Sequence, residues 1–259
     1  MKKRYRIQFP KQGSFDLGQD EVSFKLIESD RRIDLRFHDY AEIYGRPGLY
    51  EQLFYERLQC SSPQKVGEIL AQTLRANGQS TRELRVLDLG AGNGMMGEVL
   101  RAQGVSRLVG ADIIQAACDA ALRDRPDVYD EYYVADFTAL DAGLVEDIGA
   151  WGIDCLTVVA ALGFGDIPPA AFLQAMQFVR EGGWIAFNIR DTFLDASDDS
   201  GFSRFVREMI AGRFLSVHHL ERYRHRLSME GAPLFYYALV ARKNEDVPTD
   251  FLASRSIVA

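Results

Sequence analysis

The chain has 259 residues, of which 47% are hydrophobic and 26% charged, and its formal net charge is −7. This composition is typical of a globular protein, and the acidic balance argues against nucleic-acid partners, which need a basic face. The basic first residues lack the apolar stretch of a signal peptide, and no apolar run is long enough to cross a membrane. We therefore expect a cytoplasmic protein with no membrane partner.

The first part of the chain predicts a small extension before the main domain. Two runs at 22–27 and 32–37 alternate apolar and polar residues around a polar turn, which predicts a β-hairpin. The Gly-Arg-Pro-Gly stretch at 45–48 then divides an aromatic-rich segment into a short helix and a longer one near 48–59. We interpret residues 38–58 as a lid that shapes an acceptor pocket.

From residue 62 onward, apolar runs and helical patterns alternate. Strands are predicted at 84–89, 107–112, 132–136, 154–160 and 184–190, with helices at 62–77, 94–103, 115–124, 138–147, 169–180 and 200–211. This alternation predicts a mostly parallel sheet with helices on both faces. Two further strand-like runs, 214–227 and 233–242, have no helix between them and should pair antiparallel. The last residues of the chain have the character of a tail.

The cysteines are few and widely separated. Cys60, Cys118 and Cys155 form no C-x-x-C pair, so they predict thiols in a reducing compartment, not a disulfide or zinc framework. No group of histidines, cysteines and acids has the spacing of metal ligands, and no metal is predicted.

A glycine-rich loop after the first core strand fits two ligands. Gly92 to Gly97 matches G-x-G-x-x-G, the dinucleotide-binding pattern. Gly90 to Gly94, preceded by Asp88, matches the loop that binds S-adenosylmethionine (SAM). Asp112, roughly 20 residues further on, fits a ribose-binding acid in either register.

Three features favour SAM. Asp88 at the end of the strand suits the positively charged ammonium and sulfonium of SAM, whereas a dinucleotide gains nothing from a carboxylate there. Asp136 and Phe137 follow the third core strand, where an acceptor for an exocyclic amine and a ring would meet adenine. The antiparallel ending also differs from a dinucleotide fold, which would stay parallel.

Four motifs stand in the order and spacing of one enzyme family. They are VLDLGAGNG, VGADI, VADF and EGGWIAFNIRD. Over residues 62–243 the chain resembles the class I SAM-dependent methyltransferases, in the style of their small-molecule branch. The resemblance implies an α/β fold with a Rossmann-like, seven-stranded, mostly parallel sheet and an antiparallel C-terminal hairpin. We expect an N-terminal hairpin and lid extension over 1–61, a SAM-binding core over 62–243 and a tail over 244–259.

The resemblance also implies the positions that bind the cofactor. These are Asp88, Gly90, Ala91, Gly92, Gly94, Asp112, Ile113, Asp136, Phe137, Ala160 and Leu162. Asp112 would take both ribose hydroxyls and Ile113 would lie against the adenine. Asp136 would lie at the adenine edge, or it would simply cap the following helix.

The methyl acceptor is the least determined part of the site. His38, Tyr44 and Arg190 are the candidate catalytic residues. The fourth core strand lacks the Asn/Asp-Pro-Pro-aromatic motif that grips base amines, so we expect transfer to an oxygen or nitrogen of a small molecule. The alternatives are a lyase or aminopropyl-transferring enzyme of the same fold, and a non-catalytic partner subunit. The sequence does not decide whether the protein forms a homodimer.

Overall fold

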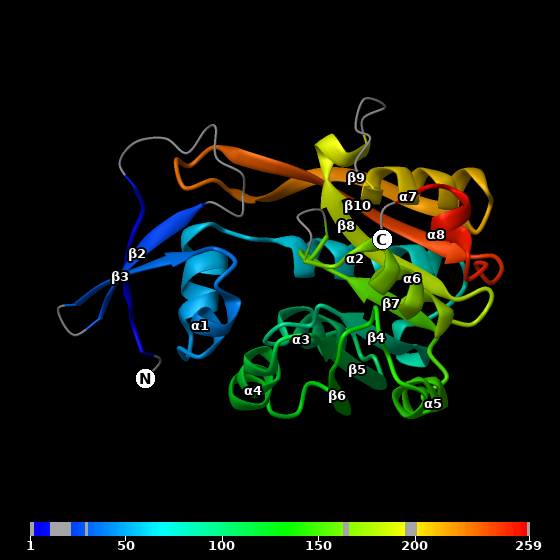
Figure 1. Ribbon diagram of the computed structural model, residues 1–259, viewed down its shortest axis with the longest axis horizontal. Helices are drawn as coiled ribbons and strands as arrows, with labels where there is room; N and C mark the ends of the chain where they lie inside the picture. Colours follow the sequence, from blue (N-terminus) through cyan, green and yellow to red (C-terminus); the bar gives the residue numbers. More distant parts are fainter. Residues whose placement is uncertain (1–2, 11–21, 29–30, 163–165, 195–200, 258–259) are drawn as a thin grey trace.

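The computed structural model describes residues 3–10, 22–28, 31–162, 166–194 and 201–257. A large sheet with its helices forms most of the molecule, and a smaller N-terminal unit lies beside it (Figure 1). The expected turn at 29–30 and residues 11–21 lie outside the described residues.

The large sheet contains seven strands. In spatial order they are β6 (Glu131–Val134), β5 (Arg107–Asp112), β4 (Arg85–Leu89), β7 (Cys155–Val158), β8 (Trp184–Arg190), β10 (Pro233–Lys243) and β9 (Leu215–Leu227). The first five run parallel, and β10 pairs antiparallel with both β8 and β9. This confirms the predicted sheet. The chain changes direction of winding at β4 and β7, and ligands of such sheets bind where the strands end at that point.

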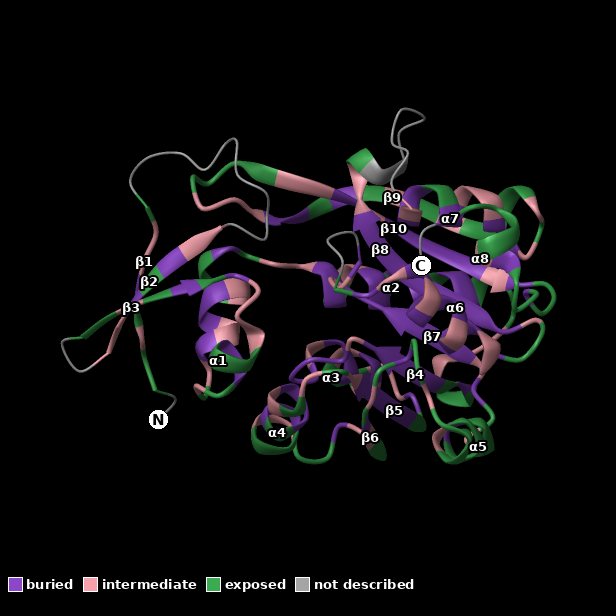
Figure 2. Ribbon diagram, viewed as in Figure 1, coloured by how far each residue is buried: buried purple, intermediate pink, exposed green. Residues whose placement is uncertain are grey.

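Helices cover both faces of this sheet. They are α2 (Ser62–Ala76), α3 (Met95–Ala102), α4 (Gln115–Asp124), α5 (Ala142–Ala150), α6 (Pro169–Gln177) and α7 (Gly201–Ala211), with short 3₁₀ turns η2 (Thr81–Glu83) and η3 (Asp191–Leu194). Neighbouring residues of a strand point to opposite faces, so Val86 packs with α2 and α3, whereas Leu87 packs with α6 and α7. The central strands are therefore buried on both sides (Figure 2).

The N-terminal unit has its own sheet and core. It contains β1 (Arg6–Gln8), β2 (Ser23–Glu28), β3 (Arg31–Arg36), α1 (Tyr40–Tyr44) and the π-helical η1 (Glu51–Arg57). Pairing of β2 with β3 confirms the predicted hairpin. Strand β1 was not expected, because three residues carry too little pattern to stand out from an irregular segment. The buried side chains of the hairpin pack on apolar residues of the following helices, such as Ile43 and Leu53.

The two units are joined by backbone pairing. Leu227 at the end of β9 donates from its N–H to the Leu58 carbonyl at 2.7 Å, and Ser61 donates to the His225 carbonyl at 2.9 Å. The hairpin of β9 and β10 extends toward the N-terminal unit (Figure 1). The far end of this hairpin therefore contacts both units. The boundary expected at residue 61 lies among residues that form these hydrogen bonds.

The final segment differs from the tail that we expected. Val247, Phe251 and Ile257 are buried in the core on the α6 and α7 side, and α8 (Phe251–Ser254) forms there. The apolar residues of this short segment give no sustained periodic signal, so only tertiary packing reveals their role. Within the described residues, no helix is both long and apolar enough to span a membrane.

Candidate functional site

The loop after β4 exposes bare backbone at the edge of the sheet. Gly90, Gly92 and Gly94 have φ of +71°, +54° and +87°, values that residues with a side chain rarely adopt. A Cβ on Gly90 would lie 2.9 Å from side-chain atoms of Ala161 and Ile167. Both conformation and space therefore require glycine, and the loop leaves room for a ligand to approach the start of α3.

Asp112 ties this loop to the end of β5. Its carboxylate accepts from the Gly92 N–H and the Ile114 N–H, each at 3.0 Å. Burial raises the pKa of Asp112 in spite of these donors. Each carboxylate oxygen keeps a lone pair for a further hydroxyl donor. The neighbouring Ile113 also lines the cavity, and 61% of its surface is exposed, so a flat apolar ring would find an uncovered surface there.

Asp136 and Phe137 form the wall after β6. Asp136 Oδ1 accepts from the Thr138 N–H at 2.8 Å and the Thr138 hydroxyl at 2.7 Å, bonds that lower its pKa. These bonds close a turn and do not cap a helix: α5 begins at Ala142, and its N-cap is Asp141, which accepts from the Leu144 N–H at 2.9 Å. The helix-capping alternative for Asp136 is therefore wrong, and Asp136 lines the same cavity as Asp112. Phe137 is buried, and its ring packs edge-on against Phe178.

Asp88 lies beneath the loop and is not among the residues that line the cavity. Only 1% of it is exposed, and it accepts hydrogen bonds from Tyr129 and Thr157, each at 2.7 Å. Burial raises its pKa to about 6. A direct contact with the cofactor remains a prediction. The buried position of Asp88 favours an electrostatic role, because a cation bound at the glycine loop would stabilise the ionised carboxylate of Asp88.

We expect SAM affinity to fall by about tenfold as the pH is lowered from 7 to 5, because protonation removes the charge of Asp88, whose pKa is about 6. The raised pKa also means that ionisation of Asp88 destabilises the ligand-free fold as the pH rises through 6. Calorimetric titration across this range measures the first effect. The Asp88→Asn variant keeps the shape and should lose the pH dependence. An unchanged pH profile in that variant would assign the titration to another group.

A buried polar network fixes the end of β7. Ala160 has a φ of +59°, which is strained for a residue with a side chain. Its N–H donates to Asn188 Oδ1 at 2.7 Å, and Asn188 Nδ2 donates to the Tyr223 hydroxyl at 2.8 Å. Ser62 and His225 complete the network, with 2.6 Å between the Ser62 hydroxyl and the imidazole. We interpret these residues as positioning groups that hold Ala160 in place.

His225 is buried within this network. Only 5% of His225 is exposed, and burial lowers its pKa well below the ordinary value, so the ring stays neutral. Its β-strand reaches the N-terminal unit, and the residues that bury it are distant in sequence.

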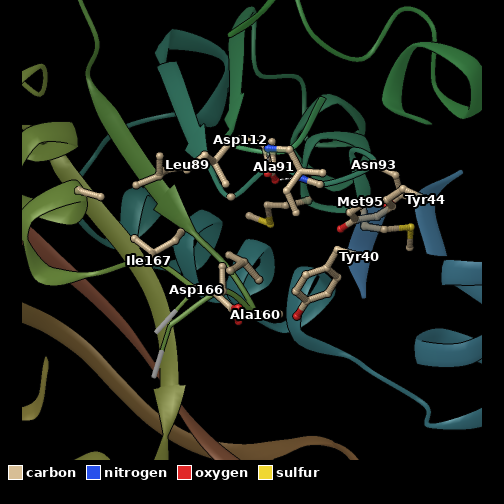
Figure 3. Close-up of a pocket in the computed structure, with 18 of the residues that line it drawn as sticks. Tyr40, Tyr44, Leu89, Ala91, Asn93, Met95, Asp112, Ala160, Asp166 and Ile167 are labelled. Carbon is tan, nitrogen blue, oxygen red and sulfur yellow. Dashed lines mark hydrogen bonds between the residues drawn. The ribbon is translucent and has the colours of Figure 1, made fainter. Parts of the chain in front are cut away.

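Aromatic residues of the N-terminal segment cover the cavity. Tyr40, Tyr44, Tyr50 and Tyr55 line it, and Figure 3 shows Tyr40 and Tyr44 across from Ala160 and Asp166. The cavity has a volume of about 170 Å³. The segment thus lies over the glycine loop as the lid hypothesis requires, although its ability to open stays a prediction.

Polar contacts hold this segment against the core. Glu51 pairs with Arg125 at 3.0 Å and accepts from Asn93 Nδ2 at 3.0 Å, and Arg123 donates to the Tyr44 carbonyl at 3.1 Å. Because Asn93 belongs to the glycine loop, Glu51 links the cover directly to the loop.

The three candidate catalytic residues are not brought together. Tyr44 lines the cavity, and burial raises its pKa well above the ordinary value, so it is a hydrogen-bond donor and not a base near neutral pH. His38 stacks on Tyr40 with 5.5 Å between ring centroids and is not among the lining residues. Arg190 lies half-buried at the end of β8, also outside the lining of this cavity.

Asp166 is a candidate that sequence reasoning did not select. It lines the main cavity and also a second, smaller cavity of about 30 Å³. Burial raises its pKa and the nearby His38 lowers it, with burial the larger effect. The second cavity shares five residues with the first, namely Tyr40, Tyr50, Ala160, Ala161 and Asp166. Leu162, expected among the residues that bind the cofactor, lines this second cavity and not the main one.

Solved structures with a similar fold include methyltransferases. Magnesium protoporphyrin IX methyltransferase from Synechocystis with bound SAM has a TM-score of 0.50 at 16% identity, over 70% of this chain and 79% of that chain. Its complex with S-adenosylhomocysteine (SAH) has a TM-score of 0.50 at 15% identity, over 70% and 83%. A putative RNA methyltransferase from Pyrococcus horikoshii has a TM-score of 0.49 at 13% identity, over 70% and 84%. At these identities, the likeness to the two structures of magnesium protoporphyrin IX methyltransferase shows the fold alone.

No curated protein matches the chain at a significant level. The profile of a family described as a methyltransferase domain matches residues 57–230, which is more than half of the sequence. This range contains the glycine loop, Asp112 and the strands that carry them. Together with the fold, the match identifies the chain as a member of the class I SAM-dependent methyltransferase family.

Proposed function

We propose that this protein transfers a methyl group from SAM to an oxygen or nitrogen atom of a small molecule in the cytoplasm. The observation that carries the proposal is the cavity itself: the glycine loop and Asp112 form one wall, and tyrosines of the N-terminal segment cover it. A covered cavity suits a small acceptor better than a polymer. The free cysteines Cys60, Cys118 and Cys155 are consistent with a reducing compartment.

The residues present fit SAM. The backbone at Gly90 and Gly92 would border the methionine part, because both glycines line the cavity and carry no side chain. Asp112 would accept from the ribose hydroxyls, and the exposed side chain of Ile113 would meet the adenine, with Phe137 and Asp136 behind it. The buried charge of Asp88 complements a cationic ligand.

The protein's contribution to the chemistry is mainly alignment. When bound, SAM supplies a methyl group that its sulfonium already activates, so the chain has to bring the nucleophile into line and exclude water. Alignment of this kind is worth roughly 7–11 kcal/mol in favourable cases. Ala160, held by Asn188, fixes the strand end, and Tyr40 and Tyr44 close the site from the other side.

A nucleophile that carries a proton also needs a group to accept it. Asp166 is suited to this role because it lines both cavities and because burial raises the pKa of its carboxyl group, which makes it a better proton acceptor. Proton acceptance by a positioned carboxylate typically contributes about 10²- to 10⁴-fold to the rate. Tyr44 would then serve as a hydrogen-bond donor in the same cavity.

Two experiments test the proposal. Calorimetric titration should show binding of SAM and SAH with micromolar Kd values, which correspond to roughly 8 kcal/mol. A coupled assay for SAH release should then detect transfer to one member of a panel of small phenols, acids and amines. Tight NADH binding without SAM binding would overturn the cofactor assignment. SAM binding with release of a product other than SAH would favour the lyase or aminopropyl-transferring alternative.

A further inference from the structure

Arg226 is a buried cation at the end of β9. Only 4% of it is exposed. Its guanidinium donates to the Leu227 carbonyl at 3.0 Å and lies 5.5 Å from the ring centroid of Phe37. These contacts engage one nitrogen of the guanidinium as a donor. Neither contact places an anion against its positive charge.

No carboxylate among the described residues forms an ion pair with Arg226 within 4 Å. A buried charge without a counter-charge is costly. The neighbouring groups are neutral, because burial keeps His225 deprotonated and raises the pKa of the Cys60 thiol. Burial also lowers the pKa of Arg226, but the guanidinium remains charged near neutral pH. The protein therefore holds here a buried positive charge that has no ion-pair partner within 4 Å, although the carboxyl group of Asp166 lines the same cavity.

The charge lies in the part of the site that the cofactor motifs do not use. Arg226 lines the second cavity together with Tyr236, Phe54 and residues shared with the main cavity. The shared residues include Ala160 at the end of β7, so the second cavity opens beside the strand end. Aromatic side chains, among them Tyr236 and Phe54, form part of its wall, which suits a planar ligand.

We propose that Arg226 binds a carboxylate of the methyl acceptor, so that the enzyme acts on a small aromatic carboxylic acid. This inference rests on the proposed function. A guanidinium offers a planar pair of donors that matches a carboxylate. Asp166 lines both cavities, and in its ionised form it repels the acceptor's carboxylate, so that Arg226 is the group in the second cavity that attracts it.

The test uses SAH-saturated protein and two probes of nearly the same shape, benzoate and benzamide. Benzoate should bind more tightly than benzamide to the wild type. Arg226→Gln should raise the Kd of benzoate by about tenfold to 100-fold, since a charged hydrogen bond is lost, and leave benzamide unchanged. Arg226→Lys should show a smaller rise because it keeps the charge without the planar fork. The matched control is Arg224→Gln, because Arg224 is exposed on the same strand. This variant should bind benzoate as the wild type does.

A second readout needs no acceptor. If Arg226 serves a ligand, Arg226→Met should raise the Tm of the ligand-free protein, because an apolar side chain removes the buried charge and keeps the contact with Phe37. A lowered Tm together with unchanged benzoate binding would show a structural role and overturn the proposal.

Three further outcomes would also overturn the proposal. Equal binding of benzoate and benzamide to the wild type would exclude a carboxylate subsite. Tighter binding of phenyl phosphate than of benzoate, lost in Arg226→Gln, would assign the subsite to a phosphate. A rise of the SAH Kd in Arg226→Gln would assign the arginine to the cofactor. Failure of the proposed function is seen separately, as absence of SAH binding to the wild type before any probe is added.

Discussion

The Asp112→Ala variant is expected to bind SAH about 100-fold more weakly than the wild type. Two losses add up in this variant. The carboxylate no longer accepts from the ribose hydroxyls, and hydrogen bonds to a charged group are worth about 1.5–3 kcal/mol each. The Gly92 N–H also loses its acceptor at 3.0 Å, so the glycine loop is less firmly held. Calorimetric titration with SAH measures the combined effect.

The two losses can be separated with a modified ligand. In the wild type, SAH that lacks the ribose 2′-hydroxyl should bind more weakly than SAH, whereas Asp112→Ala should bind the two ligands equally. Asp112→Asn is the matched control, because its amide oxygen can still accept one backbone N–H and its affinity should lie between the others. If removal of the 2′-hydroxyl weakens ligand binding to both proteins by the same factor, Asp112 does not contact the ribose.

Much of the large sheet could be predicted because its signals are local. The strand at 107–112, the helix at 115–124 and the strand at 184–190 have the bounds that the apolar runs and caps indicate. The order of the strands follows from the alternation of strand and helix together with the final hairpin. Elements that depend on contacts far away in sequence were missed, such as β1 and the buried residues of the final segment.

The same division holds for the site. Residues that follow strands in recognisable motifs, such as Gly92 and Asp112, do line one cavity. Asp166 and Arg226 could not be selected, because neither belongs to a recognisable motif and only the fold brings them to the cavity edge. Asn188 gave no signal either, since an asparagine within an apolar strand reveals its role only through the strained Ala160 beside it.

Gly92→Ala is expected to destabilise the protein by about 2–4 kcal/mol and to weaken SAH binding at least tenfold. The φ of +54° costs an alanine about 1–2 kcal/mol, and its Cβ would lie 2.5 Å from the Tyr44 hydroxyl. Gly78→Ala is the matched control, because Gly78 has a φ of +71° with no atom within 4 Å of the added Cβ. Gly78→Ala should be destabilised only by the conformational cost of its positive φ, and it should bind SAH as the wild type does. Urea unfolding and calorimetry measure the two effects.

The Tyr44→Phe substitution separates the steric contact with Tyr44 from the backbone strain at residue 92. Without the hydroxyl, the nearest ring atom of residue 44 is Cζ, 3.4 Å from the new Cβ, which is an ordinary contact. The double variant Gly92→Ala/Tyr44→Phe should therefore recover about 1–2 kcal/mol relative to Gly92→Ala, because overpacking is relieved and the backbone cost remains. Such coupling requires that Tyr44 lies on the glycine loop in solution. If the two substitutions are additive, the segment that carries Tyr44 stands away from the loop, and the tyrosine cover of the cavity is not its resting state.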